Sequence, residues 1–358
     1  MSLNASNQST IGVVPASEPY STVNDTHMGS IIAMAVYLGF LSICGGFGNL
    51  LVVIAIAISP KLRTPSYIFV ANLGIADLGV NFVVIPVTIV SMFRPGWPPS
   101  DVGCRIMFYL FIIGISISLE TIFLIAVNRY CLIVKPRAKF DKYCSIKPVI
   151  ASLVYVWVSS IFFIILPEFG FGTFHYDDTL RQCYADFTDK ASYWHVNALI
   201  FYGFFSTFIL IPTLYCLTFR AVRKSRRRVQ PDLNAPTGGT NNNIGNVAKV
   251  VSDKELRMTK LMVLIFMLIV ICWTPFCIVH FFKKDFDVPV AIERLAVMLV
   301  YSNSSVNPYL YAWLNSNFRK AYKVILSCGK KGHNVAALND STHSTAASAT
   351  ALHLNIAS

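Results

Sequence analysis

Two acidic side chains lie inside long apolar stretches of this 358-residue chain, where a charge could do chemistry. Asp77 is the only charged residue in the stretch 67–92, and Glu120 is the only one in 106–127. Ionisable groups at membrane depth are costly and usually functional. The oxygen-bearing side chains that could join Asp77 are Asn49, Ser118, Asn303, Ser304 and Asn307. Such a cluster could hold water or Na⁺; the alternative is a neutral Asp77 in a polar core network. Glu120 could face a neighbouring helix or reach toward the surface, and we assign it no role.

Catalytic patterns are not found in the sequence. It shows no nucleophile–base constellation and no phosphate-binding loop, and no cysteine or histidine pair has the spacing of a zinc site. We therefore predict a protein that is not an enzyme. We expect no cofactor and no metal apart from an allosteric Na⁺ at Asp77.

Seven apolar stretches must position these side chains. Hydrophobic residues make up 54% of the chain and charged residues only 13%, whereas a soluble protein carries about 25% charge. A helix needs roughly 20 apolar residues to cross a bilayer. We expect spans at about 31–58, 67–92, 104–134, 148–166, 194–222, 256–282 and 291–314. The predicted fold is an all-α membrane protein, with a seven-helix bundle at 31–314.

The distribution of positive charge gives the orientation. The net charge is +12, from 30 Lys and Arg against 18 Asp and Glu. Most of these basic residues fall in segments that are cytoplasmic if the N-terminus lies outside, as the positive-inside rule requires. The basic excess therefore does not indicate a nucleic-acid partner. We expect a multi-pass plasma-membrane protein with an extracellular N-terminus.

The outer segments carry candidates for glycosylation and for a disulfide. Residues 1–30 contain no Lys or Arg and hold glycosylation acceptors at Asn4, Asn7 and Asn24, with chance occurrence as the alternative. Cys104 begins the third span, and Cys183 lies between the fourth and fifth spans. Both face an oxidising compartment, so we expect a disulfide rather than two unpaired thiols.

Four prolines lie inside the expected spans, at Pro86, Pro212, Pro275 and Pro308. An interior proline kinks a helix because it lacks the N–H group. Kinks beside polar residues suggest a bundle that bends as a switch. The alternative is a set of structural kinks with no moving part.

Short motifs follow one another in a fixed order along almost the whole chain. They are Gly48-Asn49, Leu73-Gly-Ile-Ala-Asp77, Cys104, Asn128-Arg129-Tyr130, Trp157, Pro212, Cys272-Trp273-Thr274-Pro275 and Asn307-Pro308-Tyr309-Leu310-Tyr311. In this order, and at these depths in seven spans, they make the chain resemble the rhodopsin-like (class A) G-protein-coupled receptors. The resemblance implies a receptor that transmits an extracellular signal to a heterotrimeric G protein.

The resemblance also implies roles for the switch residues. Arg129 resembles the arginine that holds the inactive state and then engages the G protein, with Glu255 as its partner. The alternative is an exposed ion pair of little energy. Asn128 replaces the usual neighbouring acid, which would raise basal activity, and Trp273 resembles the toggle beneath the ligand pocket. The expected switch residues are Asn128, Arg129, Tyr130, Glu255, Trp273, Pro275, Asn307, Pro308 and Tyr311.

The same resemblance argues against two classes of ligand. Phe111 stands where aminergic receptors carry Asp, and Tyr301 stands where opsins carry the retinal lysine. The expected pocket lining is Phe108, Phe111, Ile115, Phe204, Phe208, Trp273, Phe276, His280 and Tyr301. This aromatic set suits a small neutral or amphipathic extracellular ligand, although some of these side chains could merely pack between helices.

Local sequence narrows the resemblance further. The runs Asn128-Arg129-Tyr130-Cys131 and His175-Tyr176-Asp177 are similar to those of melatonin receptors. Asn307-Pro308 departs from their common Asn-Ala, and Moody-type orphan receptors share the Asn-Arg-Tyr form. The chain therefore looks like a member of the melatonin-receptor or Moody-type orphan group, which implies a melatonin-like ligand and the inhibitory G-protein class. The alternatives are an orphan receptor for a lipid or peptide, and a membrane transporter or pump.

The segments after the last span should meet the inner membrane surface. Apolar residues from Phe318 to Leu326 recur at helical spacing between basic ones, which predicts an amphipathic helix 8 at 315–328. Cys328 is a candidate for palmitoylation, with a free thiol as the alternative. Residues 329–358 should form a disordered tail, either inert or phosphorylated by receptor kinases and bound by arrestin. The expected partners thus include membrane lipids as well as these proteins.

Overall fold

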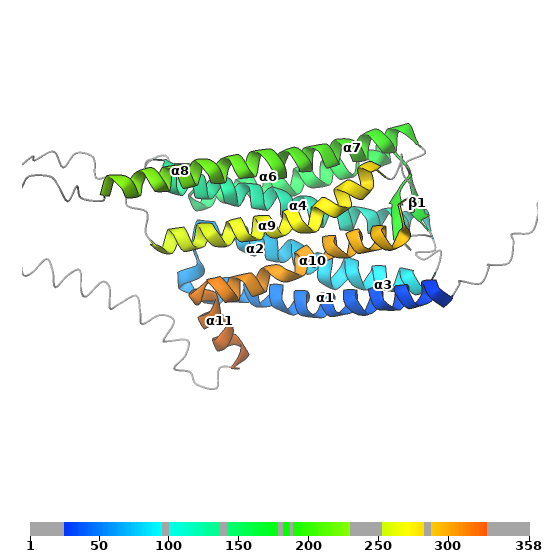
Figure 1. Cartoon of the computed structure of the whole chain (residues 1–358), viewed down its shortest axis with the longest axis horizontal. Coiled ribbons are helices and arrows are strands. Elements are labelled where there is room, and N and C mark those ends of the chain that lie inside the picture. The colour runs from blue at the N-terminus through cyan, green and yellow to red at the C-terminus, as the bar shows by residue number, and fades with distance from the viewer. Residues whose placement is uncertain are drawn as a thin grey trace, which may run out of the picture.

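The computed structural model describes residues 25–94, 100–135, 142–177, 182–186, 189–229, 253–282 and 288–327. Within these ranges, seven long helical segments lie side by side in one bundle (Figure 1). The glycosylation acceptors Asn4, Asn7 and Asn24, the palmitoylation candidate Cys328 and the tail 329–358 lie outside the described residues.

The helices cover six of the expected spans and extend past several of them, whereas α6 ends two residues before the end of the expected span 148–166. The bundle consists of α1 (Asp25–Ile58), α2 (Pro65–Gly79) with η2 (Val80–Val84) and α3 (Ile85–Phe93), α4 (Asp101–Val134), α6 (Ile146–Ile164), α7 (Lys190–Phe205) with η4 (Ser206–Leu210) and α8 (Ile211–Val229), α9 (Asp253–Phe282) and α10 (Val290–Leu314). Short 3₁₀ turns follow α1, at η1 (Pro60–Leu62), and α6, at η3 (Leu166–Phe169). The polar starts of α1 and α9 and the basic end of α8 lengthen these helices beyond their apolar stretches.

Hydropathy alone identifies six membrane spans in the part of the chain that the structure describes. The seventh, α10, has 25 residues, which extend about 37 Å at 1.5 Å per residue and suffice to cross a bilayer. Its hydropathy is lowered by buried polar residues such as Ser302, Ser304 and Asn307. These side chains face the other helices, so they do not meet the lipid.

Two spans contain a π-helical segment that ends two residues before a proline. Segment η2 precedes Pro86, and η4 precedes Pro212. Proline cannot donate a backbone hydrogen bond, and its ring clashes with the carbonyl four residues earlier. A wider π turn accommodates that clash. The prolines predicted kinks at these places, but they did not predict the change of helical period.

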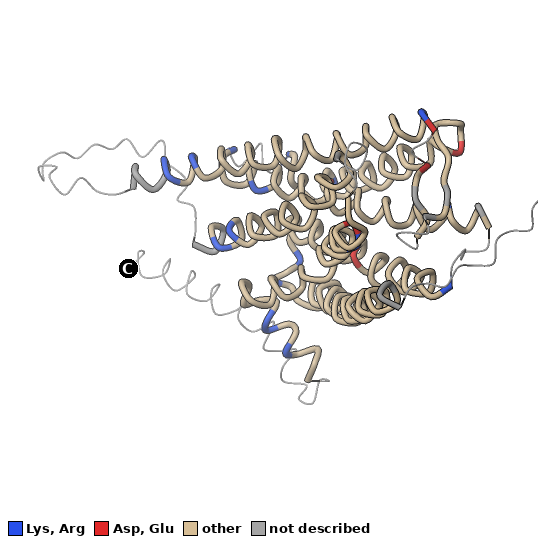
Figure 2. The backbone as a smooth tube through the Cα atoms, turned by 45° about the vertical axis from the view of Figure 1, so that its right-hand side comes forward, with Lys and Arg blue, Asp and Glu red and all other residues tan. Residues whose placement is uncertain are grey.

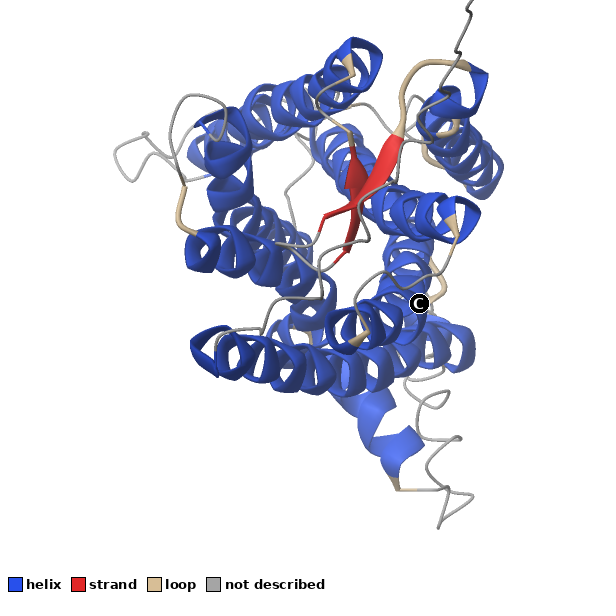
Figure 3. Ribbon diagram, turned by 90° about the vertical axis from the view of Figure 1, so that its right-hand side faces the viewer, coloured by secondary structure: helices blue, strands red, loops and turns tan. Residues whose placement is uncertain are grey.

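A β-hairpin covers one end of the bundle. Strand β1 (Phe174–Asp177) pairs antiparallel with β2 (Gln182–Ala185), with Tyr176 opposite Cys183. Figure 3 shows the two strands lying across the ring of helices. The predicted Cys104–Cys183 disulfide is confirmed and ties β2 to the start of α4. The hairpin itself was not predicted, because its strands are only four residues long.

A short helix, α11 (Ser316–Leu326), leaves the opposite end of the bundle at an angle to the spans (Figure 1). It lies where the amphipathic helix is expected. Phe318 is fully buried, and its ring lies 5.2 Å from that of Tyr311 and 5.7 Å from that of Tyr67. Figure 2 shows basic residues gathered at this end of the molecule, on α11 and at the ends of α8 and α9.

Candidate functional site

Asp77 is fully buried in the bundle and joins three spans. From α10, Asn307 Nδ2 donates a hydrogen bond to Asp77 Oδ2 at 2.9 Å. From α4, Ser118 Oγ lies 3.5 Å from Asp77 Oδ1. The side chain of Ser304, also on α10, interacts with the same carboxyl group. One side chain of α2 thus contacts two neighbouring spans.

A layer of asparagines extends this cluster to α1. Asn49 Nδ2 donates to the carbonyl oxygen of Ser304 at 2.8 Å. Asn81 Nδ2 donates to the carbonyl oxygens of Asp77, at 2.8 Å, and of Ser304, at 3.2 Å. Asn303 is also buried, next to Ser304 in α10. Asn81 was not predicted from the sequence, although it lies one helical turn after Asp77.

The cluster offers oxygen atoms of the kind that bind hard cations. The side-chain oxygens of Asn49, Asn303 and Asn307 are buried, and each lacks a hydrogen-bond partner among the described residues. With the carboxylate of Asp77 and the hydroxyl of Ser118, they form an oxygen-only donor set. This chemistry fits Na⁺.

The predicted switch residues near the C-terminal end of α4 are mostly buried. Arg129 is 2% exposed and Asn128 is 3% exposed. Asn128 Oδ1 accepts a hydrogen bond from Ser66 Oγ of α2 at 2.7 Å. The ammonium group of Lys135 lies 5.5 Å from the ring centre of Tyr130. The side chain of Glu255, the predicted partner of Arg129, lies outside the described residues.

Tyr311 connects the C-terminal end of α10 to α11. It is 1% exposed, and its ring stacks on Phe318. Its buried hydroxyl has no hydrogen-bond partner in the part of the chain that the structure describes. Pro308 lies one turn earlier inside α10, and Pro275 lies inside α9 just after Trp273.

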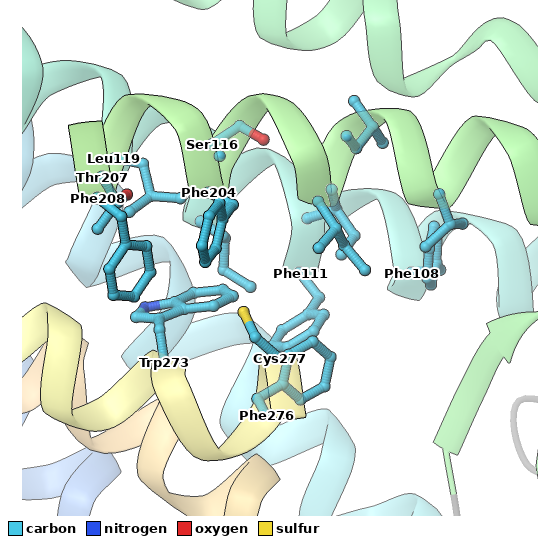
Figure 4. A pocket seen from close by; sticks show the side chains of 16 residues that line it. Phe108, Phe111, Ser116, Leu119, Phe204, Thr207, Phe208, Trp273, Phe276 and Cys277 are labelled. Carbon is cyan, nitrogen blue, oxygen red and sulfur yellow. The ribbon is translucent and has the colours of Figure 1, made fainter. Parts of the chain in front are cut away.

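An aromatic cavity lies between α4, α7, η4 and α9. Its empty volume is about 860 Å³, part of it open to solvent. In Figure 4, Phe204 and Phe208 project from the α7–η4 helix toward Trp273 of α9. The rings of Phe204 and Phe208 stack with their centres 4.5 Å apart. The lining consists of Phe108, Phe111, Ile112, Ile115, Ser116, Leu119, Val196, Leu199, Ile200, Gly203, Phe204, Thr207, Phe208, Trp273, Phe276 and Cys277.

Two residues predicted for this pocket lie elsewhere. Tyr301 lines an adjoining smaller cavity, and its hydroxyl lies 3.3 Å from Thr88 Oγ1. Phe108 and Phe111 line both cavities. The ring of His280 stacks on Phe276, 6.4 Å away, and His280 lines neither cavity.

Several lining residues escaped the sequence prediction. Cys277 follows Trp273 by one helical turn, so period 3.6 could have identified it. Thr207 lies in the π segment η4, where that period does not hold. Ser116 is a small polar residue on an apolar span, and no signal in its type or spacing indicates a pocket.

At the hairpin end, Asp189 caps the first turn of α7. Asp189 Oδ2 accepts hydrogen bonds from the backbone N–H of Ser192 at 2.9 Å and from its hydroxyl at 3.0 Å. These hydrogen bonds favour the ionised form and hold the pKa of Asp189 below its usual value. Ser192 Oγ also accepts from the backbone N–H of Thr173 at 2.7 Å, which connects α7 to the segment before β1.

Comparison with known proteins places this architecture in one family. The profile of the 7 transmembrane receptor (rhodopsin family) matches residues 48–311. The chain is 29% identical over 300 residues to melatonin receptor type 1A of Mus musculus, covering 82% of this chain and 80% of that protein. It is 28% identical over 315 residues to the histamine H2 receptor of Cavia porcellus, covering 85% and 82%.

Among solved structures, squid rhodopsin shares the fold, with a TM-score of 0.69 and 21% identity, covering 87% of this chain and 91% of that one. The family profile spans all seven helical segments in part or whole and contains the Asp77 cluster, Arg129 and the aromatic cavity. The chain is therefore a multi-pass membrane protein that belongs to the rhodopsin family of seven-transmembrane receptors.

Proposed function

We propose that this receptor binds a small neutral or amphipathic extracellular ligand in the aromatic cavity and activates a heterotrimeric G protein. The observation that carries the proposal is the buried indole N–H of Trp273. It has no hydrogen-bond partner among the described residues, and Trp273 lines a mostly apolar cavity. A buried donor without an acceptor is costly, so a ligand that supplies one would gain affinity and bias the position of α9.

Our specific candidate ligand is melatonin or a close analogue. Two features support it: local motifs similar to those of melatonin receptors, and the 29% identity to a protein named melatonin receptor type 1A. An aromatic bicycle with hydrogen-bonding groups suits a cavity of aromatic walls and few polar atoms. The test is a melatonin dose series on cells that express the chain, with G-protein subunit dissociation as the readout.

A matched pair of variants makes this test specific to the cavity. Phe208→Ala removes a lining ring and should weaken the response at least tenfold, which corresponds to about 1.4 kcal/mol. Ile209→Ala alters the next residue of η4, which faces outward and is 48% exposed, and should leave the response unchanged. Silence of the wild-type receptor at a saturating dose would reject melatonin, and a ligand panel of lipids and peptides would then address the alternatives.

We further propose coupling to the inhibitory G-protein class, through the inner ends of α4, α8 and α9. The basic residues at this end would also hold anionic lipid headgroups. Suppression of cyclic AMP should disappear after pertussis toxin treatment. Signalling that the toxin leaves unchanged would contradict this class.

The same proposal extends to the location, the further partners and a bound ion. The receptor would reside in the plasma membrane with its N-terminus outside, and its tail would engage receptor kinases and arrestin. Na⁺ would be held by Asp77, Ser118 and Asn307, where it would supply a positive charge that neutralises the buried carboxylate. That charge would stabilise one arrangement of α2, α4 and α10.

A further inference from the structure

A second cavity adjoins the aromatic one on the side away from α9. It has an empty volume of about 480 Å³ and lies between α4, α6 and the α7–η4 helix. Its lining is Ser116, Leu119, Glu120, Ser160, Phe163, Ile164, Leu199, Tyr202, Gly203 and Ser206. Four of these residues, Ser116, Leu119, Leu199 and Gly203, line both cavities. The two spaces are therefore separated only by shared walls.

Glu120 supplies an acidic group to this second cavity. It lies near the middle of α4, and Ser159 Oγ lies 3.4 Å from its Oε2. Ser159 Oγ also lies 3.2 Å from the carbonyl oxygen of Val156, and one hydroxyl proton serves both acceptors. A carboxylate can accept about four hydrogen bonds, so Glu120 keeps most of its capacity for another donor.

Ser160 gives an independent sign of a ligand at the same place. It lines the second cavity and is 3% exposed, and its hydroxyl has no hydrogen-bond partner among the described residues. A buried hydroxyl left without a partner costs about 1–3 kcal/mol. A donor that contacts Glu120 from within the cavity could satisfy this oxygen as well.

Gly203 belongs to the wall that the two cavities share. A Cβ built on it would lie 3.7 Å from Leu119 Cδ1, which is ordinary van der Waals contact. Alanine therefore fits at this position, whereas a leucine side chain would extend into the shared wall. The two substitutions therefore differ in how much of the space between the cavities they fill.

We propose that the two cavities form one site for an amphipathic amine, with its apolar body in the aromatic cavity and its ammonium group against Glu120 and Ser160. The inference rests on the proposed ligand site in the aromatic cavity and concerns ligands that carry an ammonium group; melatonin, which has none, would occupy the aromatic cavity alone. An ammonium group offers three donors, and its charge offsets the cost of a carboxylate at membrane depth. Phe111 excludes an ammonium partner only at the position where aminergic receptors carry Asp. Glu120 lies nine residues further along α4 and could pair with an ammonium group there.

The test compares two probes of the same shape on the full chain in lipid nanodiscs. The amine is 2-(2-naphthyl)ethylamine, and the neutral isostere is 2-(2-naphthyl)ethanol. Calorimetry should give at least tenfold tighter binding for the amine. Glu120→Gln should abolish that preference, while Glu168→Gln, which removes a half-exposed acid at the hairpin end, should preserve it. Gly203→Leu should remove the preference, and Gly203→Ala should retain it.

The outcomes separate this inference from the proposed function. Equal affinity of both probes for the wild type, no binding of either, or a preference that survives Glu120→Gln would each overturn the amine site. Equal affinity would still uphold ligand binding in the aromatic cavity. An amine preference without ligand-dependent G-protein dissociation would uphold the site and contradict the signalling proposal. Melting temperatures of the unliganded variants check that each is folded.

Discussion

At the residue scale, Asp77 shows how a bundle tolerates a buried acid. Its two carboxylate oxygens meet donors from α4 and α10, and its backbone carbonyl accepts from Asn81. Buried polar groups are tolerated when they are hydrogen-bonded, and networks that are only partly satisfied are the places where a ligand or ion can enter. The three asparagine oxygens without partners mark such a place.

We predict that Na⁺ stabilises the wild-type receptor through Asp77. Replacing N-methylglucamine chloride by NaCl at constant ionic strength should raise the melting temperature, because the ion binds only the folded state. At a concentration of 100 times the Kd, the gain would be about 2.7 kcal/mol. Asp77→Asn should lose this response, and Glu120→Gln, which changes the other membrane carboxyl group, should keep it. An unchanged Na⁺ response in Asp77→Asn would contradict the assignment.

A second residue-scale prediction concerns pH at the start of α7. Because the native pKa of Asp189 is lowered, its capping contribution is complete above its usual pKa of 3.8. The contribution is lost only as pH falls through the still lower native pKa. Hydrogen exchange at the amides of Ser192 and Tyr193, corrected for intrinsic rates, should therefore be constant between about pH 7 and 5. Asp189→Asn should remain protected because asparagine also caps helices, whereas Asp189→Ala should exchange faster.

At the scale of elements, close helix contacts depend on single glycines. A Cβ built on Gly45 of α1 would collide with Asn81 Oδ1 and with Ser305 Oγ, both part of the polar layer around Asp77. Small residues let helices approach closely within a membrane. The approach of α1 to η2 and α10 therefore requires a residue without a side chain at this position.

We predict that Gly45→Ala destabilises the receptor by about 1–3 kcal/mol, the usual cost of overpacking. Gly39→Ala is the matched control on the same helix, because nothing lies within 4 Å of its built Cβ. Gly39→Ala should be neutral or stabilising by up to about 1 kcal/mol, since alanine favours helix. Thermal unfolding in detergent measures both variants, and equal stability of the two would count against the packing argument.

The elements also show where sequence prediction succeeds and where it fails. Long apolar stretches predict all seven spans because lipid contact demands apolar side chains, although hydropathy marks only six of the described helices and leaves out α10. The aromatic lining was largely predicted from the positions of Phe111, Phe208 and Trp273. Tyr301 instead lines the adjoining smaller cavity beside Phe111, and His280 stacks on Phe276 without lining either cavity. The π segments could not be predicted, since local composition does not reveal an extra residue in a turn.

At the scale of the whole molecule, basic and acidic residues are distributed unequally between the two ends of the bundle. Basic residues gather at the end that carries α11, and the hairpin end carries acids such as Glu168 and Asp189 (Figure 2). Glu168 is held there by Arg105, at 3.3 Å, and by the hydroxyl of Tyr109, at 2.7 Å. The arrangement supports the proposed orientation, with the hairpin outside.

We predict that the N-terminal tail is glycosylated when the receptor is expressed in animal cells. Peptide N-glycosidase treatment should increase the electrophoretic mobility of the wild type. The triple variant Asn4→Gln, Asn7→Gln, Asn24→Gln should already migrate at the faster position. A wild type that the enzyme does not shift would leave the outer location of the N-terminus without this support.

The hairpin across one end of the bundle should affect how long a ligand stays bound rather than how tightly it binds. Phe174 of β1 lies with its ring centre 4.9 Å from that of Phe108, a wall of the cavity, and the disulfide fixes β2 to the same helix. A ligand in the aromatic cavity would therefore have to pass the disulfide-linked hairpin to leave. We expect a long residence time that shortens when the disulfide is removed. Such a receptor would keep signalling after a brief pulse of its stimulus has ended.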